Sequence, residues 1–241
     1  MVAVGFYQVL DRMRRGINIS IVLMICAFLW KCTEIKETDP VEFDTIYFPL
    51  EVGSVHVYQV SGVRYNSVQD STEFSYLLKE SVVDSFRNLE SGISYKIQRQ
   101  KKLNEAEPWV MDSIWTARMD GNAAVRVENN VPTVRLTFPL KENKTWDGNK
   151  LNEKREDEFE MVNVKQPFST SVGSYEKTVT VIQEELPDYI VKFIFQKEVY
   201  AESTGLVYKE YIILEYDQKN GQQTVESGIR YYQRLIEYEE E

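Results

Sequence analysis

The greater part of this chain has no cysteine and almost no histidine. Both cysteines among the 241 residues, Cys26 and Cys32, lie near the N-terminus. The rest of the chain therefore cannot hold a framework of intrachain disulfides or a metal site built from thiolates. His56 is the single histidine, which excludes a histidine-rich metal site within one chain. We expect no metal and no cofactor.

Motifs for catalysis are also missing. The chain has no Gly-x-Ser-x-Gly, no phosphate-binding glycine loop and no calcium-type carboxylate loop. A Ser-His-Asp triad would need His56, whose neighbours predict a packed or surface position on a strand. Glycoside hydrolysis needs two carboxylates at a defined separation. Many are present, including Asp112, Asp147, Glu198 and Glu210, so chance pairs are expected. We expect a protein that is not an enzyme, with a carboxylate-dependent hydrolase as a weaker alternative.

Positive charge is scarce. The chain has 28 basic and 38 acidic residues, a formal net charge of −10. Without residues 1–31, the remainder has 24 basic and 37 acidic residues, a net charge of −13. Such a surface repels nucleic acid and anionic lipid headgroups. No basic patch interrupts it, so we expect no nucleic-acid partner.

The N-terminus has the three parts of an export signal. Three arginines within residues 12–15 precede an apolar run over residues 17–30. A membrane-spanning helix needs roughly 20 apolar residues, so this run is too short to span a bilayer. We expect a signal helix over residues 1–31. Met13 is an alternative start, which would make residues 1–12 superfluous.

Cys32 is the expected site of lipid attachment. Leu29 lies three residues before it, as in a bacterial lipobox, whereas Trp30 and Lys31 differ from the small residues usual at those positions. Cleavage at Cys26 would leave an apolar mature end, so Cys32 is the better candidate. The alternatives are an uncleaved signal anchor, an ordinary signal peptide, or a cytosolic protein with a buried apolar helix.

These features predict a protein of the cell envelope that is lipid-anchored to the membrane, in the outer membrane on its periplasmic or surface face. The acidic, polar residues 32–46 predict a flexible tether. Residues 47–241 then form a single β-rich domain, which is long enough to bury a core of its own.

Period-two alternation with Tyr, Val, Ile, Phe and Thr extends from Tyr47 to the end of the chain. The expected strands cover residues 55–60, 73–84, 93–98, 109–117, 123–128, 134–138, 178–183, 189–200, 206–216 and 225–238. Asn129-Asn130 predicts a hairpin turn. Residues 147–149 predict a loop, and residues 153–160 either an exposed excursion or the entry of a strand. About ten or eleven strands predict an all-β fold, a strongly curved antiparallel sheet that forms a closed or half-open barrel, with at most a short helix or two.

Three short motifs resemble a family of uncharacterised lipoproteins from Bacteroidetes. They are Tyr47-Phe-Pro-Leu-Glu-Val-Gly53, Trp146-Asp-Gly-Asn149 with Asn152, and Glu198-Val-Tyr-Ala-Glu-Ser-Thr-Gly-Leu-Val-Tyr-Lys-Glu210. The chain departs from the family where Ser-Val-His56 follows Gly53, since an aromatic residue is more typical there. The resemblance implies a lipid-anchored, β-rich domain of the envelope. It brings no established activity.

Aromatic residues give the main physical clue to function. Tyr, Phe and Trp make up 12% of the chain and gather within residues 208–216 and 231–238. In a curved sheet, the inward set either fills the core or lines a cavity for an apolar or amphipathic ligand. Trp146 either caps one end of the barrel or faces that ligand. We expect a hydrophobic ligand or an envelope protein as partner. The alternative is an assembly role in an outer-membrane complex, without a small-molecule site.

Three segments match the Asp-Ser/Thr-apolar-or-Thr pattern of O-glycosylation in Bacteroidetes. The acceptor hydroxyls would be Thr45, Ser71 and Ser113. Thr45 lies in the expected tether, where a modifying enzyme could reach it.

Overall fold

The computed structural model describes residues 41–67, 70–89, 92–186, 191–217 and 224–239. It divides the chain at Pro40 into two units, of which the second, Val41–Glu241, contains all of the described residues. The expected signal helix and Cys32 therefore lie outside the described part. Among the described residues, no helix is both long and apolar enough to cross a membrane.

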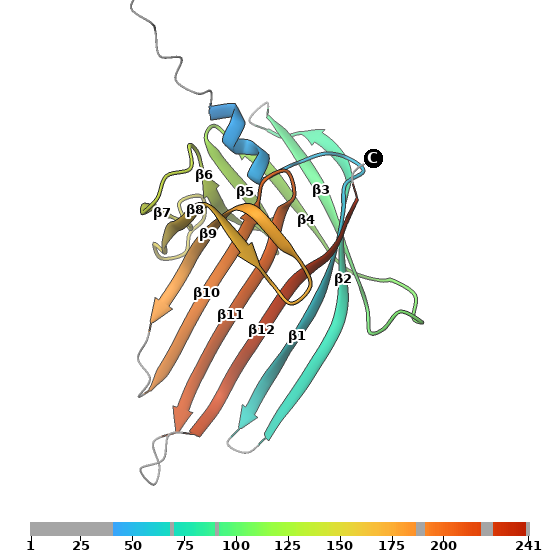
Figure 1. The fold of residues 1–241 in the computed structure, drawn as a ribbon, viewed down its shortest axis with the longest axis vertical. Helices are drawn as coiled ribbons and strands as arrows, with labels where there is room; N and C mark the ends of the chain where they lie inside the picture. The colour runs from blue at the N-terminus through green and yellow to red at the C-terminus, as the bar shows by residue number, and fades with distance from the viewer. Residues whose placement is uncertain (1–40, 68–69, 90–91, 187–190, 218–223, 240–241) are drawn as a thin grey trace, which may run out of the picture. The chain divides into compact units, whose positions relative to one another are not determined.

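The second unit consists of a 3-10 helix and twelve strands. These are η1 (Val41–Tyr47), β1 (Val55–Ser67), β2 (Asp70–Arg87), β3 (Ile93–Lys102), β4 (Val110–Asp120), β5 (Ala123–Glu128), β6 (Val131–Thr137), β7 (Lys144–Asp147), β8 (Glu158–Ser169), β9 (Ser174–Leu186), β10 (Lys192–Ala201), β11 (Gly205–Asp217) and β12 (Thr224–Glu239). The strands form one antiparallel sheet in the order β6-β5-β4-β3-β2-β1-β12-β11-β10-β9-β8-β7 (Figure 1). The prediction of an all-β, antiparallel fold is confirmed.

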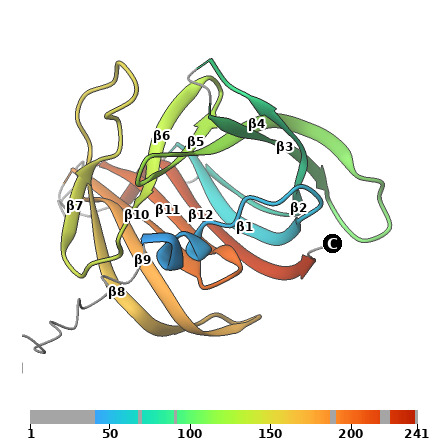
Figure 2. The ribbon, with the colours of Figure 1, turned by 90° about the horizontal axis from the view of Figure 1, so that it is seen from above.

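The sheet curves until its two edge strands approach each other (Figure 2). The backbone N–H of Val134, on β6, donates a hydrogen bond to the carbonyl of Gly148, just after β7, at 2.9 Å. The first and last strands of the chain are neighbours in the middle of the strand order, where β1 pairs with β12 from Val55↔Glu239 to Tyr65↔Gly228. The result is a nearly closed barrel, as expected.

Local turn chemistry explains the hairpin between β5 and β6. Asn129 and Asn130 have positive φ angles of 50° and 64°. A two-residue turn with both residues left-handed matches the twist of the flanking strands, and asparagine tolerates this conformation. The expected hairpin is therefore present.

The strand β7 was not expected, and of β8 only the entry was, as one of two alternatives for residues 153–160. Trp146 and Asp147 belong to β7, so the expected loop over residues 147–149 begins one residue later. In β8, Asn163 and Lys165 have positive φ angles of 53° and 58°, which interrupts the alternation on which a strand prediction depends. The carboxylate of Glu142 accepts hydrogen bonds from the backbone N–H groups there, which stabilises the irregular stretch.

The main core lies where η1 packs against the sheet. Its buried members are Tyr47, Ala124, Leu136, Phe138, Phe159, Met161, Val179, Val181, Tyr200 and Leu206. The carboxylate of Asp44 accepts a hydrogen bond from the backbone N–H of Leu140 at 2.8 Å. The last residues of the expected tether, 32–46, thus belong to η1, and Ile46 packs against this core.

A second cluster extends the core along the long strands. It contains Tyr58, Val60, Leu78, Val199, Ala201, Val207 and Leu235. The β8–β9 hairpin lies across β10–β12 in both views (Figures 1 and 2), and the Phe168 ring lies 5.4 Å from the ring of Tyr208. Within the sheet, β1 and β12 approach closely at Gly62, where a Cβ would lie 2.0 Å from the carbonyl oxygen of Arg230.

Candidate functional site: a charged cavity inside the sheet

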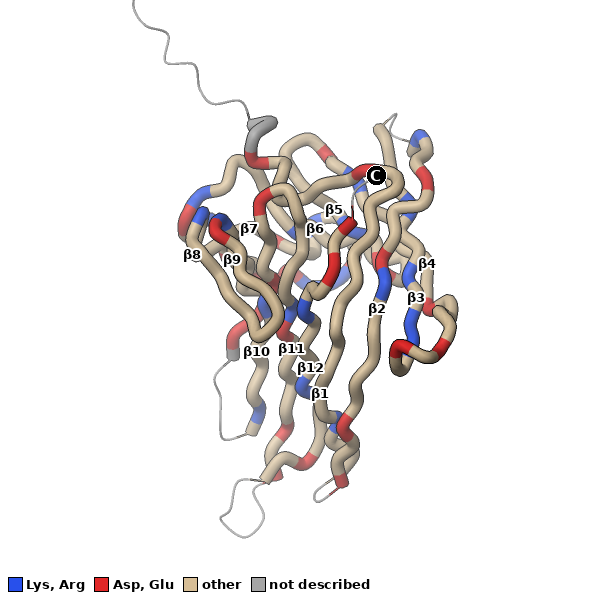
Figure 3. Tube along the Cα trace, turned by 45° about the vertical axis from the view of Figure 1, so that its right-hand side comes forward, with Lys and Arg blue, Asp and Glu red and all other residues tan. Residues whose placement is uncertain are grey.

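A cavity of about 280 Å³ lies between two walls of the curved sheet. One wall comes from β2–β5 and the other from β11 and β12. Its charged lining residues are Glu80, Arg99, Arg126, Glu128 and Lys209. Its uncharged lining residues are Trp115, Leu206, Tyr211, Ile229, Tyr231 and Gln233. The colouring in Figure 3 shows that charges of both signs lie on the strands as well as in the loops.

Glu80 is the centre of a buried ion-pair triad. It is 7% exposed. One carboxylate oxygen accepts a hydrogen bond from Nε of Arg99 at 2.9 Å, and the other accepts one from Arg126. Burial raises the pKa of Glu80, but the two guanidinium groups outweigh burial and lower the pKa to about 2. Glu80 is therefore ionised at neutral pH.

Arg99 links this triad to two residues of β4, Asp112 and Ser113. Its Nη1 donates to the carboxylate of Asp112 at 3.1 Å and to the hydroxyl of Ser113 at 3.2 Å. Asp112 also pairs with Lys101 at 2.6 Å. Burial raises the pKa of Asp112, but hydrogen bonds from Lys101 and Ser113 outweigh it and lower the pKa. Arg99 is thus held by carboxylates on both sides.

A second buried group centres on Glu198. Arg135 donates to one of its oxygens at 3.2 Å, and Lys209 lies 2.9 Å from the same oxygen. The hydroxyl of Tyr200 donates to the other oxygen at 2.6 Å. Burial raises the pKa of Glu198, but Arg135 and Lys209 outweigh it and hold the pKa far below its usual range. Glu128 joins the two groups, since its carboxylate lies 2.9 Å from Arg135 and 3.6 Å from Arg126.

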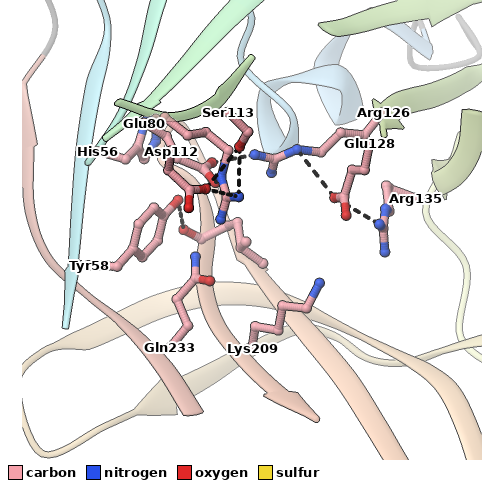
Figure 4. Close-up of polar contacts among 12 residues, drawn as sticks. His56, Tyr58, Glu80, Asp112, Ser113, Arg126, Glu128, Arg135, Lys209 and Gln233 are labelled. Atoms are coloured by element: carbon pink, nitrogen blue, oxygen red, sulfur yellow. Dashed lines mark hydrogen bonds and ion pairs between the residues drawn. The ribbon is translucent and has the colours of Figure 1, made fainter. Parts of the chain in front are cut away.

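These groups converge on one space. Figure 4 shows Glu80 of β2, Arg126 and Glu128 of β5, Arg135 of β6 and Lys209 of β11 directed toward one another. The indole of Trp115 forms an aromatic wall for this space. The guanidinium carbon of Arg99 lies 3.5 Å from the centroid of this ring and that of Arg126 lies 4.8 Å away. Both distances are within the range of cation–π attraction.

The carboxylates of the cavity are poorly suited to acid catalysis. A general acid works best when its pKa is near the working pH, and glycosidases raise the pKa of theirs. Glu80 and Glu128, which line the cavity, and Glu198, which lies beside it, have the opposite shift, because arginine and lysine partners stabilise the ionised form. No group of three His, Cys, Asp or Glu side chains able to hold a metal occurs in the described ranges. What this arrangement offers is an aromatic wall beside fixed charges.

Trp146 lies at the seam of the barrel and does not line the charged cavity. Its indole N–H donates to the carbonyl of Val134 at 3.0 Å, which joins the two edge strands β6 and β7. Its ring meets Phe159 edge-on, with centroids 6.0 Å apart at an angle of 72°. The structure therefore places Trp146 in the barrel wall, where β6 and β7 meet, packed against Phe159.

The other expected site residues are spread over the molecule. Ser113 is brought into the charged cluster through Arg99. Ser71 is exposed on β2, and Thr45 is half-buried in η1, where its carbonyl accepts a hydrogen bond from the N–H of Phe48. His56 lies 2.7 Å, through Nε2, from the carbonyl oxygen of Thr204, which gives it a structural contact.

Most of the charged residues of the cavity were not expected. Arg126 stands between Val125 and Val127, and Arg135 between Val134 and Leu136. A charge in such a strand is usually read as part of a solvated face. Because the residues on either side of an arginine point to the other face of the sheet, these apolar neighbours gave no local signal that the arginines face inward.

Comparisons with known proteins give solved structures of low similarity, two of which are described below. No family model and no curated protein matches the chain. One structure, from Bacteroides fragilis, is described as an exported protein with a YmcC-like fold; it has 14% identity and a TM-score of 0.45, covering 80% of this chain and 98% of its own. The other, from Parabacteroides distasonis, is described as a lipoprotein; it has 14% identity and a TM-score of 0.43, with the same coverage. Such scores assign neither a family nor a function to this chain.

Proposed function

We propose that this protein is a non-enzymatic lipoprotein of the cell envelope that binds an amphipathic or hydrophobic ligand inside its curved sheet. The cavity between β2–β5 and β11–β12 carries this proposal. Ligand sites are typically concave, with apolar and aromatic walls and a few placed polar groups. Trp115, Leu206, Ile229 and Tyr231 supply the apolar wall, and the ion-pair groups supply the polar one.

Binding is tested by native mass spectrometry of the full-length protein extracted from its own membrane. We expect an adduct of constant mass on the wild-type protein. Ile229→Trp, which fills the cavity, should remove the adduct. The matched control is Ile236→Trp on the same strand, because Ile236 is 40% exposed and does not line the cavity.

Two results would count against ligand binding. Wild-type protein that is consistently empty would contradict the proposal and would favour the alternative of an assembly partner without a small-molecule site. An adduct that persists in Ile229→Trp but disappears in Ile236→Trp would place the ligand outside this cavity.

The envelope assignment is supported by the sequence of the N-terminus. The basic residues, the short apolar run and Cys32 form an export signal that ends at a lipid-modifiable cysteine. We propose an outer-membrane location. Metabolic labelling with a palmitate analogue should mark the wild type and Cys26→Ala but not Cys32→Ala, and membrane fractionation should place the label in the outer membrane. Label that persists in Cys32→Ala would show that the anchor is elsewhere.

A further inference from the structure

We infer that the ligand of this cavity is an anionic amphiphile, whose oxyanion head is bound by Arg99, Arg126, Lys209 and Gln233. This inference rests on the proposed binding function and adds the chemical class of the ligand. Three observations support it: hydrogen-bond donors at the cavity lack acceptors, the charged groups carry an excess of positive charge, and the remaining lining residues are mostly aromatic or aliphatic.

Hydrogen-bond donors exceed acceptors at the cavity. The two oxygens of Glu80 are both occupied by arginines. Those of Glu198 are occupied by Arg135 and Lys209 on one side and by the Tyr200 hydroxyl on the other. A guanidinium group has five N–H donors. Nη2 of Arg99 and Nη1 of Arg126 donate to none of the described residues, so these donors remain available to a ligand.

Gln233 is the second, independent observation. It is 3% exposed and lines the cavity. Its Oε1 accepts a hydrogen bond from the hydroxyl of Tyr231 at 2.7 Å, which fixes the orientation of the amide. The amide nitrogen donates to none of the described residues, so it is available to a ligand oxygen. Two other donors that line the cavity, Nε1 of Trp115 and Nε of Arg126, are buried without a hydrogen-bond partner among those residues, which is costly unless a ligand oxygen satisfies them.

The charge balance points to the same ligand class. The cluster contains four cations, namely Arg99, Arg126, Arg135 and Lys209, and three carboxylates, namely Glu80, Glu128 and Glu198. Asp112 pairs both with Arg99 and with Lys101, whose side chain is 40% exposed, so the connected ion pairs hold five cations and four carboxylates in all. This excess of one positive charge, in a chain with a net charge of −10, favours an anion over a cation as the ligand.

The remaining lining defines the rest of the ligand. Trp115, Tyr211, Ile229 and Tyr231 present rings and an aliphatic side chain beside the free donors. The volume of about 280 Å³ is close to the lower end of ligand pockets, roughly 300 Å³. An oxyanion head with a short apolar body fits this space. A carboxylate and a phosphate share this chemistry.

Four probes with the same ten-carbon chain test the inference: decanoate, decyl phosphate, decanol and decyltrimethylammonium. Binding is followed by isothermal titration calorimetry with the full chain, at concentrations where none of the probes forms micelles. We expect decanoate and decyl phosphate to bind at least about tenfold more tightly than decanol, since a charge-assisted hydrogen bond contributes about a factor of ten or more. The cationic probe should bind most weakly.

Two variants locate the head group. Lys209→Met and Gln233→Leu should each weaken decanoate binding by about tenfold and leave decanol unchanged. The matched control is Lys197→Met, because Lys197 pairs with Glu210 away from the cavity lining and should have no effect. Circular dichroism and the thermal midpoint establish that each variant is folded, and Gln233→Leu keeps all charges if Lys209→Met does not fold.

Failure of the anionic head group and failure of ligand binding as such give different results. If none of the four probes binds, the proposed function fails. The assignment of an anionic head group is refuted if decanol or decyltrimethylammonium binds as tightly as decanoate. It is also refuted if Lys209→Met and Gln233→Leu leave the preference for decanoate over decanol unchanged. In both cases the proposal that the cavity binds a ligand is retained. Inorganic phosphate is the chainless probe, and if it binds as tightly as decyl phosphate, the apolar wall makes no contribution and the ligand is a free anion.

Discussion

Replacing Glu80 by glutamine removes the charge on which two buried arginines depend. Glu80 is 7% exposed and accepts hydrogen bonds from both Arg99 and Arg126. Removing one partner of a buried ion pair typically costs 3–5 kcal/mol, because it leaves an uncompensated charge in the interior. We therefore expect Glu80→Gln to lower the free energy of unfolding by about 3–5 kcal/mol at pH 7.

The pH dependence gives an independent estimate of this effect. The pKa of Glu80 falls from 4.5 to about 2 in the folded protein. A depressed carboxylate pKa stabilises the folded state above the unfolded pKa, and this stability is lost as the pH falls through the folded value. The shift corresponds to about 3 kcal/mol at neutral pH. Most of this contribution should disappear between pH 4.5 and pH 2, so the wild type and Glu80→Gln should approach each other in stability there.

Urea denaturation followed by tryptophan fluorescence, at pH 7 and at pH 3, measures both quantities. Glu105→Gln is the control, since Glu105 pairs with Lys102 at the surface with its side chain 78% exposed, and such pairs contribute about 0–1 kcal/mol. A loss of less than about 1 kcal/mol for Glu80→Gln would refute the reasoning. So would a difference from the wild type that is the same at both pH values.

Two further predictions concern the barrel seam and the core. Trp146→Phe should lower the free energy of unfolding by about 1–2 kcal/mol, because it removes the hydrogen bond to the Val134 carbonyl. Amide hydrogen exchange should also become faster in β6 and β7, and unchanged exchange in these strands would contradict a role at the seam. Tyr47→Phe should leave the thermal midpoint unchanged or raise it, because the buried hydroxyl has no hydrogen-bond partner among the described residues, and a drop of several degrees would mean that this hydroxyl is satisfied.

Strands were predictable where the alternation is regular and the turns are local. A few neighbouring residues are enough to predict the strand around Val55–Val60 and the turn at Asn129-Asn130, and both predictions are confirmed. In β8, the left-handed residues Asn163 and Lys165 break the alternation, so the pattern fails where the backbone is irregular. The role of Trp146 depends on the approach of β6 and β7, which no local pattern contains.

The sequence by itself determined that the body is all-β, because period-two alternation is a local property of each strand. It also determined the net negative charge and the lack of cysteine in the β-rich body, because these follow from composition. Only the tertiary structure decided which charges meet. Arg126 lies 46 residues after Glu80, and Glu198 lies 63 residues after Arg135. Their pairing requires the closure of the sheet, and that closure turns strand charges that would otherwise be solvated into the lining of a cavity.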